Sequence, residues 1–505
     1  NSLDANLLNF LKNTPDAESD IFSFSFLNYS GKFILDSNLT TIIPLSNYNL
    51  KIKVISNNFL NGFEITTEDG TVLKFDETET SKSRNPLGTS CPKSYEYSNN
   101  ITSWYLTRIT APNKRSYMNF TYLTQNILFE QSINQFVSKC ISTEYHMYGG
   151  GDEWNTCPTG AAQSVGSETF YTCVTRQLVT SKFLSKIITS ANDTASFIYD
   201  ASMRQDLDSG KRLSQIKIIS RNGTPIRQAT LYASYSNGTG TSTYTNSNKR
   251  MYLDSLLMDD ITSSANSLSY KFEYNSRGSV ANRLTFGQDI YGYSNGHGSN
   301  PSLIPVLPST DQNYSHFNNG TGATSVTFGD RSIDTNYAKK GLLNKIIYPT
   351  GGYDTIIYYA NKYYNSTTHV LAGGSSVASI QSYSFGSKAM ERSFSYTDTS
   401  GNSSTFMLST LARCSKQDLV YTSGYICNGG QCLGCFPVSV TIGPSYWSAS
   451  VSSNLINPIT ALGSQHAYHR NVKESTVGTV NNGYTEHHYQ FFNGGNLLPY
   501  DLLNN

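Results

Sequence analysis

The chain has few charged residues, and neither sign prevails. Of its 505 residues 14% are charged, with 37 Lys and Arg against 36 Asp and Glu, whereas a typical soluble domain has about 25%. A chain without a basic excess has no general attraction for nucleic acid or for an anionic membrane. It also has no uninterrupted apolar run of the ~20 residues that a membrane-spanning helix needs. We therefore expect no nucleic-acid partner and no insertion into a membrane.

Catalytic sequence motifs are also missing. The chain contains no His-Glu-x-x-His and no phosphate-binding loop, the local patterns that support zinc-protease and nucleotide chemistry. A glycosidase would need two carboxylates about 5–10 Å apart in a cleft, and nothing in the sequence singles out such a pair. We predict that the protein is not an enzyme and binds no cofactor.

Asn, Ser, Thr, Gly and aromatic residues take the place of the missing charges. The 36 Tyr and 24 Phe exclude a disordered chain, because disordered segments are poor in aromatics. This composition is common in secreted and cell-surface β proteins, so we expect an extracellular location. The chain begins at Asn1 without a recognisable signal peptide, which is expected of a processed chain or a fragment.

The stretch "YAKKGLLNKIIYPTGGYDTIIYYANKYYN", from Tyr337 to Asn365, predicts a β-hairpin. Branched and aromatic residues suit strands, and Pro-Thr-Gly-Gly supplies a tight turn. Apolar pairs such as Ile346-Ile347 put apolar groups on both faces, so we expect strands half covered on both sides. Four tyrosines should stack on aromatics of neighbouring repeats and hold a wall together: Tyr348, Tyr353, Tyr358 and Tyr359.

The strand–turn–strand pattern recurs about once per ~20–30 residues. Many copies end in Tyr-x-Tyr or Phe-x-Tyr before a turn, as in "LSYKFEYNSRG" and "RSFSYTDTSG". Helical patterns are few: "DANLLNFLKN" from Asp4 has helical spacing, and "ILFEQSINQFVSK" from Ile127 fits either a helix or a strand. The sequence predicts an all-β protein of antiparallel hairpins wound in order into one curved sheet.

Several blocks resemble YD-repeat (RHS-type) secreted proteins, in the long form found in the Bacteroidota. The blocks are "DAESDIFSFSFLNYSGKFILD", "FEITTEDGTVLKFDE", "TSWYLTRITAPN", "RQDLDSGKRLSQIKI", "YGYSNGHGSNPSLIP" and "YAKKGLLNKIIYPTGGY". The resemblance implies a β-hairpin spiral, which in the best understood relatives closes into a hollow shell around a toxin. Together these blocks are scattered over most of the first 350 residues.

The chain departs from this family in two respects. It has no Asp-Pro-x-Gly element, so no self-cleavage role passes to any of its aspartates. The tyrosine–aspartate step survives at Tyr199-Asp200, Tyr353-Asp354 and Tyr500-Asp501, as turn and ladder residues. We expect the part that closes the shell, and any cargo, to lie beyond Asn505.

The repeats and their interruptions suggest six regions. They are an N-terminal β region entering the spiral (1–100), YD-like hairpins with a Cys-containing insertion near 141–169 (101–277), a long polar insertion (278–336), YD-like hairpins (337–401), a Cys-rich insertion (402–444) and a further repeat (445–505). We expect changes between Gly278 and Asp334 to leave the stability of the chain nearly untouched.

Eight cysteines form two groups of four. They are Cys91, Cys140, Cys157 and Cys173, then Cys414, Cys427, Cys432 and Cys435. An even number in local groups predicts disulfides within each group in an oxidising compartment, each worth ~2–4 kcal/mol. "CNGGQCLGC" with Cys414 also matches the spacing of a plant-type iron–sulfur loop, and four thiols can hold zinc. The secreted composition favours disulfides.

Two further clusters are weaker metal candidates. The histidines are His466, His469, His487 and His488, and "HAYH" in a strand places its two rings on opposite faces. "DLDSG" offers Asp206 and Asp208 with Asp200 nearby, but the EF-hand spacing is absent, which favours a plain turn over calcium. We predict that no metal binds at either place.

The sequence therefore predicts a non-enzymatic structural segment of a secreted or cell-surface RHS/YD-repeat protein. Such a β-shell or scaffold would encapsulate or present a toxin or effector. Its partners would be the rest of its own polypeptide or the enclosed effector, and possible further partners are a secretion machinery or a cell-surface component. The alternative is a surface adhesin or glycan-binding module, whose exposed Tyr and Asn residues would engage sugars.

Overall fold

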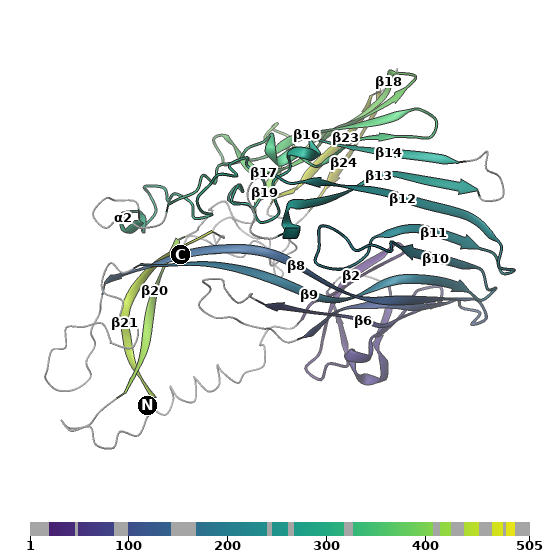
Figure 1. The fold of residues 1–505 in the computed structure, drawn as a ribbon, viewed down its shortest axis with the longest axis horizontal. Helices are drawn as coiled ribbons and strands as arrows, with labels where there is room; N and C mark the ends of the chain where they lie inside the picture. The colour runs from purple at the N-terminus through teal and green to yellow at the C-terminus, as the bar shows by residue number, and fades with distance from the viewer. Residues whose placement is uncertain are drawn as a thin grey trace.

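A computed structural model describes most of the chain. The described residues are 20–45, 49–84, 99–142, 168–239, 245–260, 267–317, 327–407, 415–425, 439–453, 467–477 and 481–489. β-Strands dominate them (Figure 1), and the predicted all-β, antiparallel class is confirmed. The segment 127–139, which fitted either a helix or a strand, is strand. The apolar segment near Asp4 lies outside the described residues. None of the helices in these ranges is long and apolar enough to cross a membrane.

A small three-stranded sheet stands at the N-terminal side of the described chain. Its strands are β1 (Phe22–Phe26), β2 (Tyr29–Leu35) and β3 (Ile42–Pro44). The alternating FSFSF of β1 turns its phenylalanines to one face, as a two-residue period requires. That face packs on the start of the main sheet, where the ring of Phe22 lies 5.5 Å from that of Phe63 and 5.7 Å from that of Trp104.

The main sheet is built from antiparallel pairs that follow one another along the chain. Its strands are β4 (Lys51–Val54), β5 (Phe63–Thr66), β6 (Val72–Arg84), β7 (Asn100–Thr110), β8 (Tyr117–Ser142), β9 (Glu168–Thr189), β10 (Thr194–Tyr199), β11 (Leu213–Ile219), β12 (Pro225–Asn237), β13 (Lys249–Asp260), β14 (Leu268–Tyr274), β15 (Leu343–Ile347), β16 (Tyr353–Tyr364), β17 (His369–Ser384) and β18 (Ser387–Ser395). Each of these strands pairs with the next, so the sequence order is also the order across the sheet.

The remaining strands extend or cross-link this ladder. They are β19 (Thr405–Met407), β20 (Ser415–Tyr425), β21 (Ser439–Ser452), β22 (Ala467–His469), β23 (Asn471–Val477) and β24 (Asn481–His488). β23 pairs with β18 and β24, β21 pairs with β8 and β20, and β19 pairs with β22. β6 also pairs with β9, which closes β6 to β9 into a ring. Helix is limited to α2 (Tyr314–Phe317) and short 3-10 turns at Ile55–Asn57, Phe59–Asn61, Thr245–Asn248, Arg277–Ser279 and Tyr337–Lys339 within the described ranges.

Most of the main sheet is one layer thick. Every residue of β10 and β15 is half-buried, which means that neither face is fully covered. The sheet curves as a wall (Figure 1) and does not fold back into a sandwich.

The hairpin predicted from the Pro-Thr-Gly-Gly turn is confirmed. β15 and β16 pair from Lys345 with Thr355 to Ile347 with Tyr353. The amide of Tyr348 donates to the carbonyl of Gly352 at 2.8 Å, and that of Gly351 donates back to Tyr348 at 3.0 Å. Gly351 has a φ of +84°, which a residue without Cβ adopts without strain.

The insertion at 278–336 is not peripheral, contrary to our expectation. Its apolar residues Ile304, Leu307 and Phe317 are buried and pack with residues of β8 and β21 in the described core. Figure 1 shows the insertion running out from the sheet to α2 beside these strands. The short apolar run "SLIPVL" is enough to attach the insertion to the core, because β8 and β21 present apolar side chains to it. The expected insensitivity of stability to changes here is therefore withdrawn.

Polar groups anchor the same insertion. The side chain of Gln135 on β8 accepts from the amide of Leu303 at 2.6 Å, and Ser415 on β20 donates to Asp311 at 2.6 Å. At β17, a Cβ on Gly373 would lie 2.8 Å from the ring of Tyr291, with Gly374 equally close to Tyr293. These two glycines leave room for the tyrosines of the insertion.

Candidate functional site

A row of tyrosines links successive hairpins through their hydroxyl groups. Each hydroxyl donates to a backbone carbonyl on the strand before its own. The pairs are Tyr122 to Leu106 at 2.6 Å, Tyr199 to Leu184 at 2.9 Å, Tyr274 to Leu253 at 2.8 Å, Tyr358 to Leu343 at 2.7 Å and Tyr396 to Val377 at 2.9 Å. Burial raises the pKa of all five hydroxyls, that of Tyr122 to about 12. They therefore stay protonated and keep donating.

These tyrosines sit where the ladder is interrupted. A shift in register occurs at Tyr122, Tyr199, Tyr274 and Tyr358 on the side of the following strand. Bulges of this kind bend a strand and increase its twist. On the side of the preceding strand, the regular pairs end three residues before Tyr274 and three before Tyr358. The hydroxyl bonds thus connect the strands beyond the last regular pair.

Along this row, backbone pairs and hydroxyl bonds alternate and connect successive strands. Tyr274 pairs across the ladder with Leu343, whose carbonyl accepts from Tyr358. Tyr358 in turn pairs with Val377, whose carbonyl accepts from Tyr396. The chain from Tyr274 to Tyr396 therefore passes from β14 to the end of β18 through alternating backbone pairs and hydroxyl bonds.

The other three tyrosines of the predicted stack contact neighbouring strands. Tyr353 stacks on Tyr383 of β17 with centroids 4.7 Å apart, and Tyr359 packs on Tyr396 at 5.3 Å. The hydroxyl of Tyr348 donates to Asp354 at 2.7 Å, and this bond raises the pKa of Tyr348 to about 12. Asp354 of the surviving tyrosine–aspartate step is thus a hydrogen-bond acceptor in the hairpin.

We predict that Tyr358→Ala lowers the free energy of unfolding by about 3 kcal/mol, the lower end for a large aromatic in a core. Tyr358→Phe keeps the ring and should cost about 1 kcal/mol, because the carbonyl of Leu343 loses its donor. Denaturant unfolding measures both. The control is Tyr484→Ala on β24, where the residue is 62% exposed. Equal losses at the two positions would refute a structural role of the row.

A buried ionic cluster lies between β8, β9 and two loops. Its centre is Glu130 of β8, whose side chain is 4% exposed. Arg176 of β9 faces Glu130 across the ladder and binds it at 3.0 Å. The register shifts just after Glu130, so the carboxylate stands at a bend in β8.

The loop between β10 and β11 brings two aspartates to the arginines around Glu130. Asp208 binds Arg176 at 2.5 Å, and its amide donates to the carbonyl of Leu128 at 3.0 Å. Asp206 accepts two hydrogen bonds from Arg204, at 3.0 and 2.6 Å. Such paired bonds between a guanidinium and a carboxylate are among the stronger ones in proteins.

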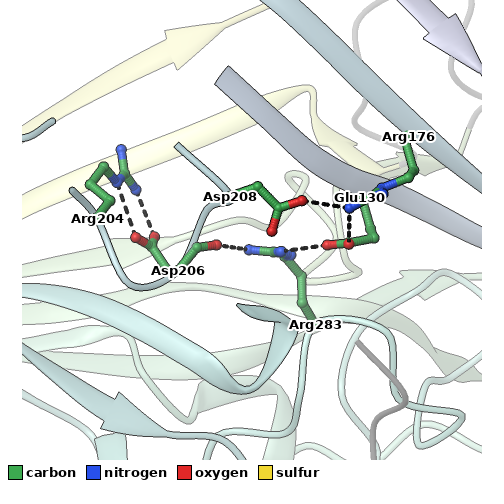
Figure 2. Close-up of polar contacts among 6 residues, drawn as sticks. All are labelled: Glu130, Arg176, Arg204, Asp206, Asp208 and Arg283. Atoms are coloured by element: carbon green, nitrogen blue, oxygen red, sulfur yellow. Dashed lines mark hydrogen bonds and ion pairs between the residues drawn. The ribbon is translucent and has the colours of Figure 1, made fainter. Parts of the chain in front are cut away.

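The insertion completes the cluster with Arg283. One end of its guanidinium binds Glu130 at 3.1 Å, and the other donates to the carbonyl of Asp206 at 2.7 Å (Figure 2). The three carboxylates of Figure 2 thus all have guanidinium partners. The cluster ties the loop and the insertion to β8 and β9.

The predicted turn at "DLDSG" is therefore a docking loop, and sequence reasoning missed its partners. Arg176 and Arg283 lie 46 and 153 residues from Glu130, so no local pattern joins them. Asp200 binds Arg212 at 2.5 Å, away from the aspartates of the cluster. The described residues include no group of three or more potential metal ligands.

The cysteine prediction stays a prediction. Of the eight, only Cys140 of β8 and Cys173 of β9 fall in the described ranges. Cys173 lies opposite Asn134, six residues along β8 from Cys140, so these two cysteines do not face each other. Cys91, Cys157, Cys414, Cys427, Cys432 and Cys435 lie outside the described residues.

The histidines do not converge on one place. His469 on β22 packs on Tyr396 with centroids 4.1 Å apart, and its ring contacts Ser376 at 2.8 Å. Burial lowers the pKa of His469 to about 4, so the ring is neutral at pH 7. His488 contacts Asn471 at 2.9 Å on exposed β24, and His487 lies beside Tyr489. His466 is outside the described residues.

The insertion holds a fully buried carboxyl group that sequence reasoning did not single out. One oxygen of Asp289 accepts from the amides of Tyr291 and Tyr293, both at 2.9 Å. The other is buried without a hydrogen-bond partner. Burial outweighs these bonds and Arg331, and raises the pKa of Asp289 to about 6.

The raised pKa of Asp289 predicts the direction in which the stability of the chain changes with pH. Because the folded chain holds the Asp289 proton up to about pH 6, while the unfolded chain releases it near pH 3.8, stability should rise as the pH falls through this window. Asp289→Asn lacks the proton and should not share this gain, which is about 3 kcal/mol at most. Urea midpoints of both chains between pH 7 and pH 4 measure it. A constant difference between them would contradict the buried charge.

The comparisons with known proteins identify no family for this chain. No family model and no curated protein matches the chain. Among solved structures, a chain of the crystal structure of TcdB2-TccC3 is similar over 88% of this chain and 26% of its own length, with 9% identity and a TM-score of 0.22. This chain therefore spans about a quarter of the length of that one. The TM-score is too low to support an argument about fold or function.

Proposed function

We propose that the chain is a non-enzymatic wall segment of a secreted or cell-surface RHS/YD-repeat protein, a β-shell or scaffold that encloses or presents a toxin or effector. The observation that carries the proposal is the row of tyrosines. The same hydroxyl-to-carbonyl bond recurs from hairpin to hairpin, and four of the five tyrosines stand at bulges that bend the sheet. Such a repeated connection suits a curved wall that extends by adding hairpins.

Two further observations support a structural role. Most of the main sheet is one layer thick, with neither face fully covered at β10 and β15, so it can cover something on one side and face solvent on the other. Glu130, which is 4% exposed, binds Arg176 of β9 and Arg283 of the insertion (Figure 2), so this buried charge holds separate segments of the chain together. In this proposal the partners are the rest of the same polypeptide and an enclosed effector, and the location is extracellular.

Cryo-electron microscopy of the whole natural polypeptide that contains this chain tests the proposal. We expect the chain to form part of a curved wall with further density on its concave side. A solid particle, or an extended stalk with solvent on both faces, would overturn the proposal. Glycan binding abolished by Tyr358→Ala without any loss of stability would favour the alternative, a surface adhesin.

A further inference from the structure

A cavity of about 690 Å³ lies where the insertion leaves and re-enters the sheet. Thr239, just past β12, and Ser279 and Ala281, just past β14, line one part of it. These segments are held together because Thr239 donates to Val280 at 2.9 Å and accepts from Asn282 at 3.0 Å. Cavities of about 300–1,000 Å³ are usual for small-molecule sites.

Glycines of "YGYSNGHGSNPSLIP" form another part of the lining. Gly296 has a φ of +79°, and a Cβ there would lie 2.5 Å from the ring of Tyr337, so the ring rests directly on bare backbone. At Gly298 a Cβ would have only the hydroxyl oxygen of Thr285 within reach, at 3.9 Å. A larger side chain at Gly298 would therefore extend into open space, without a backbone clash.

The charge in the lining is positive. The ammonium of Lys340 lies 3.5 Å from the centre of the Tyr337 ring. The nearby carboxylate of Asp334 is occupied, since it accepts from the amides of Asn336 and Tyr337 at 2.8 and 2.9 Å. Among the described residues, no carboxylate lines the cavity and no ion pair to Lys340 is formed.

The polar groups are suited to a ligand with many hydroxyl groups. Thr239, Ser279 and Ser299 each carry a hydroxyl group that can both donate and accept, and Ala281 and Tyr337 add apolar groups, so the lining is mixed. An unpaired ammonium would bind a carboxylate or a phosphate by a charge-assisted hydrogen bond.

We propose that this cavity binds a small acidic sugar, with Lys340 holding the acid group and the hydroxyls of Thr239, Ser279 and Ser299 holding the ring. The proposal does not depend on the wall function. Such a site would let a wall segment take up or sense a sugar acid or a sugar phosphate at the base of its insertion.

Isothermal titration calorimetry with glucuronic acid, N-acetylneuraminic acid, glucose 1-phosphate and neutral glucose tests it. We expect millimolar or tighter binding of at least one acidic sugar and much weaker binding of glucose. The first two probes against the third distinguish a carboxylate from a phosphate. Lys340→Gln should weaken binding about 10- to 100-fold, as the loss of a hydrogen bond to a charged group does. Gly298→Leu should abolish binding by filling the cavity.

Matched variants separate binding from folding. Lys339→Gln removes the neighbouring charge of the same 3-10 turn, and Gly278→Leu adds a side chain at an exposed glycine where a Cβ meets nothing within 4 Å. Both should bind as the natural chain does, and all four variants should keep its unfolding midpoint. Absence of binding by every probe, equal binding of glucose, or equal losses in the control variants would overturn the proposal.

Discussion

Replacing Glu130 with Ala should lower the free energy of unfolding by about 3–5 kcal/mol, the cost of leaving buried partners of an ion pair unpaired. Glu130 is 4% exposed and binds Arg176 at 3.0 Å and Arg283 at 3.1 Å. Without its carboxylate, Arg283 is left with the carbonyl of Asp206 and Arg176 with Asp208, and the two side chains are only 20% and 21% exposed. Chemical denaturation at neutral pH measures the loss as a lower midpoint.

The control for Glu130 is Glu486→Ala on β24. Glu486 is 43% exposed and lies 3.6 Å from Lys473, and exposed pairs of this kind contribute about 0–1 kcal/mol. High salt should remove the small effect at Glu486 and leave most of the effect at Glu130, because buried pairs are screened less. If the two substitutions cost the same, the cluster does not hold the loops to the sheet.

The course of the hairpins could be predicted from the sequence because their signals are local. Between Leu343 and Tyr359, the turn residues and branched strands are within about one hairpin of each other, and the structure pairs them as expected. The same stretch could not show what Tyr358 does. Its hydroxyl bonds to the carbonyl of Leu343 beyond the last regular pair of β15 and β16, next to a bulge against β17, and bulges have no clear sequence signature here.

The ionic cluster and the cavity depend on distant contacts. "DLDSG" looked like a turn with a conceivable calcium site because its carboxylates are visible in the sequence and their partners are not. Arg204 stands two residues from Asp206, but Arg176 and Arg283 come from β9 and from the insertion. The glycines around Gly296 could be recognised as a family-like block, yet the ring that needs them, Tyr337, lies in another segment.

For the insertion, the sequence-based prediction failed because a polar average composition concealed a few residues that belong to a buried core. Residues 278–336 are rich in Asn, Ser and Gly, which suggested a long polar insertion with little effect on stability. Burial depends on what a few apolar side chains pack against, and Ile304 packs against residues of β8 and β21. Average polarity could not reveal this, because it does not show which face of the sheet is left uncovered by its neighbours.

Ile304→Ala should therefore destabilise the whole chain by about 2–5 kcal/mol, as truncation in a packed core does. Ile304 is 0% exposed and packs in the described core with Val137 and Val451 of two different strands. The cavity left behind would loosen the insertion from β8 and β21 together. The unfolding midpoint in urea measures the effect, with intrinsic fluorescence and circular dichroism expected to report the same transition.

Val306 provides an internal control two residues away. It is 62% exposed, so Val306→Ala should change the free energy of unfolding by less than about 0.5 kcal/mol, as for most surface substitutions. A large gap between the two variants would place the insertion within the cooperative fold of the wall. If Ile304→Ala and Val306→Ala both left the midpoint unchanged, the insertion would be a separate unit, and the sheet would be stable without it.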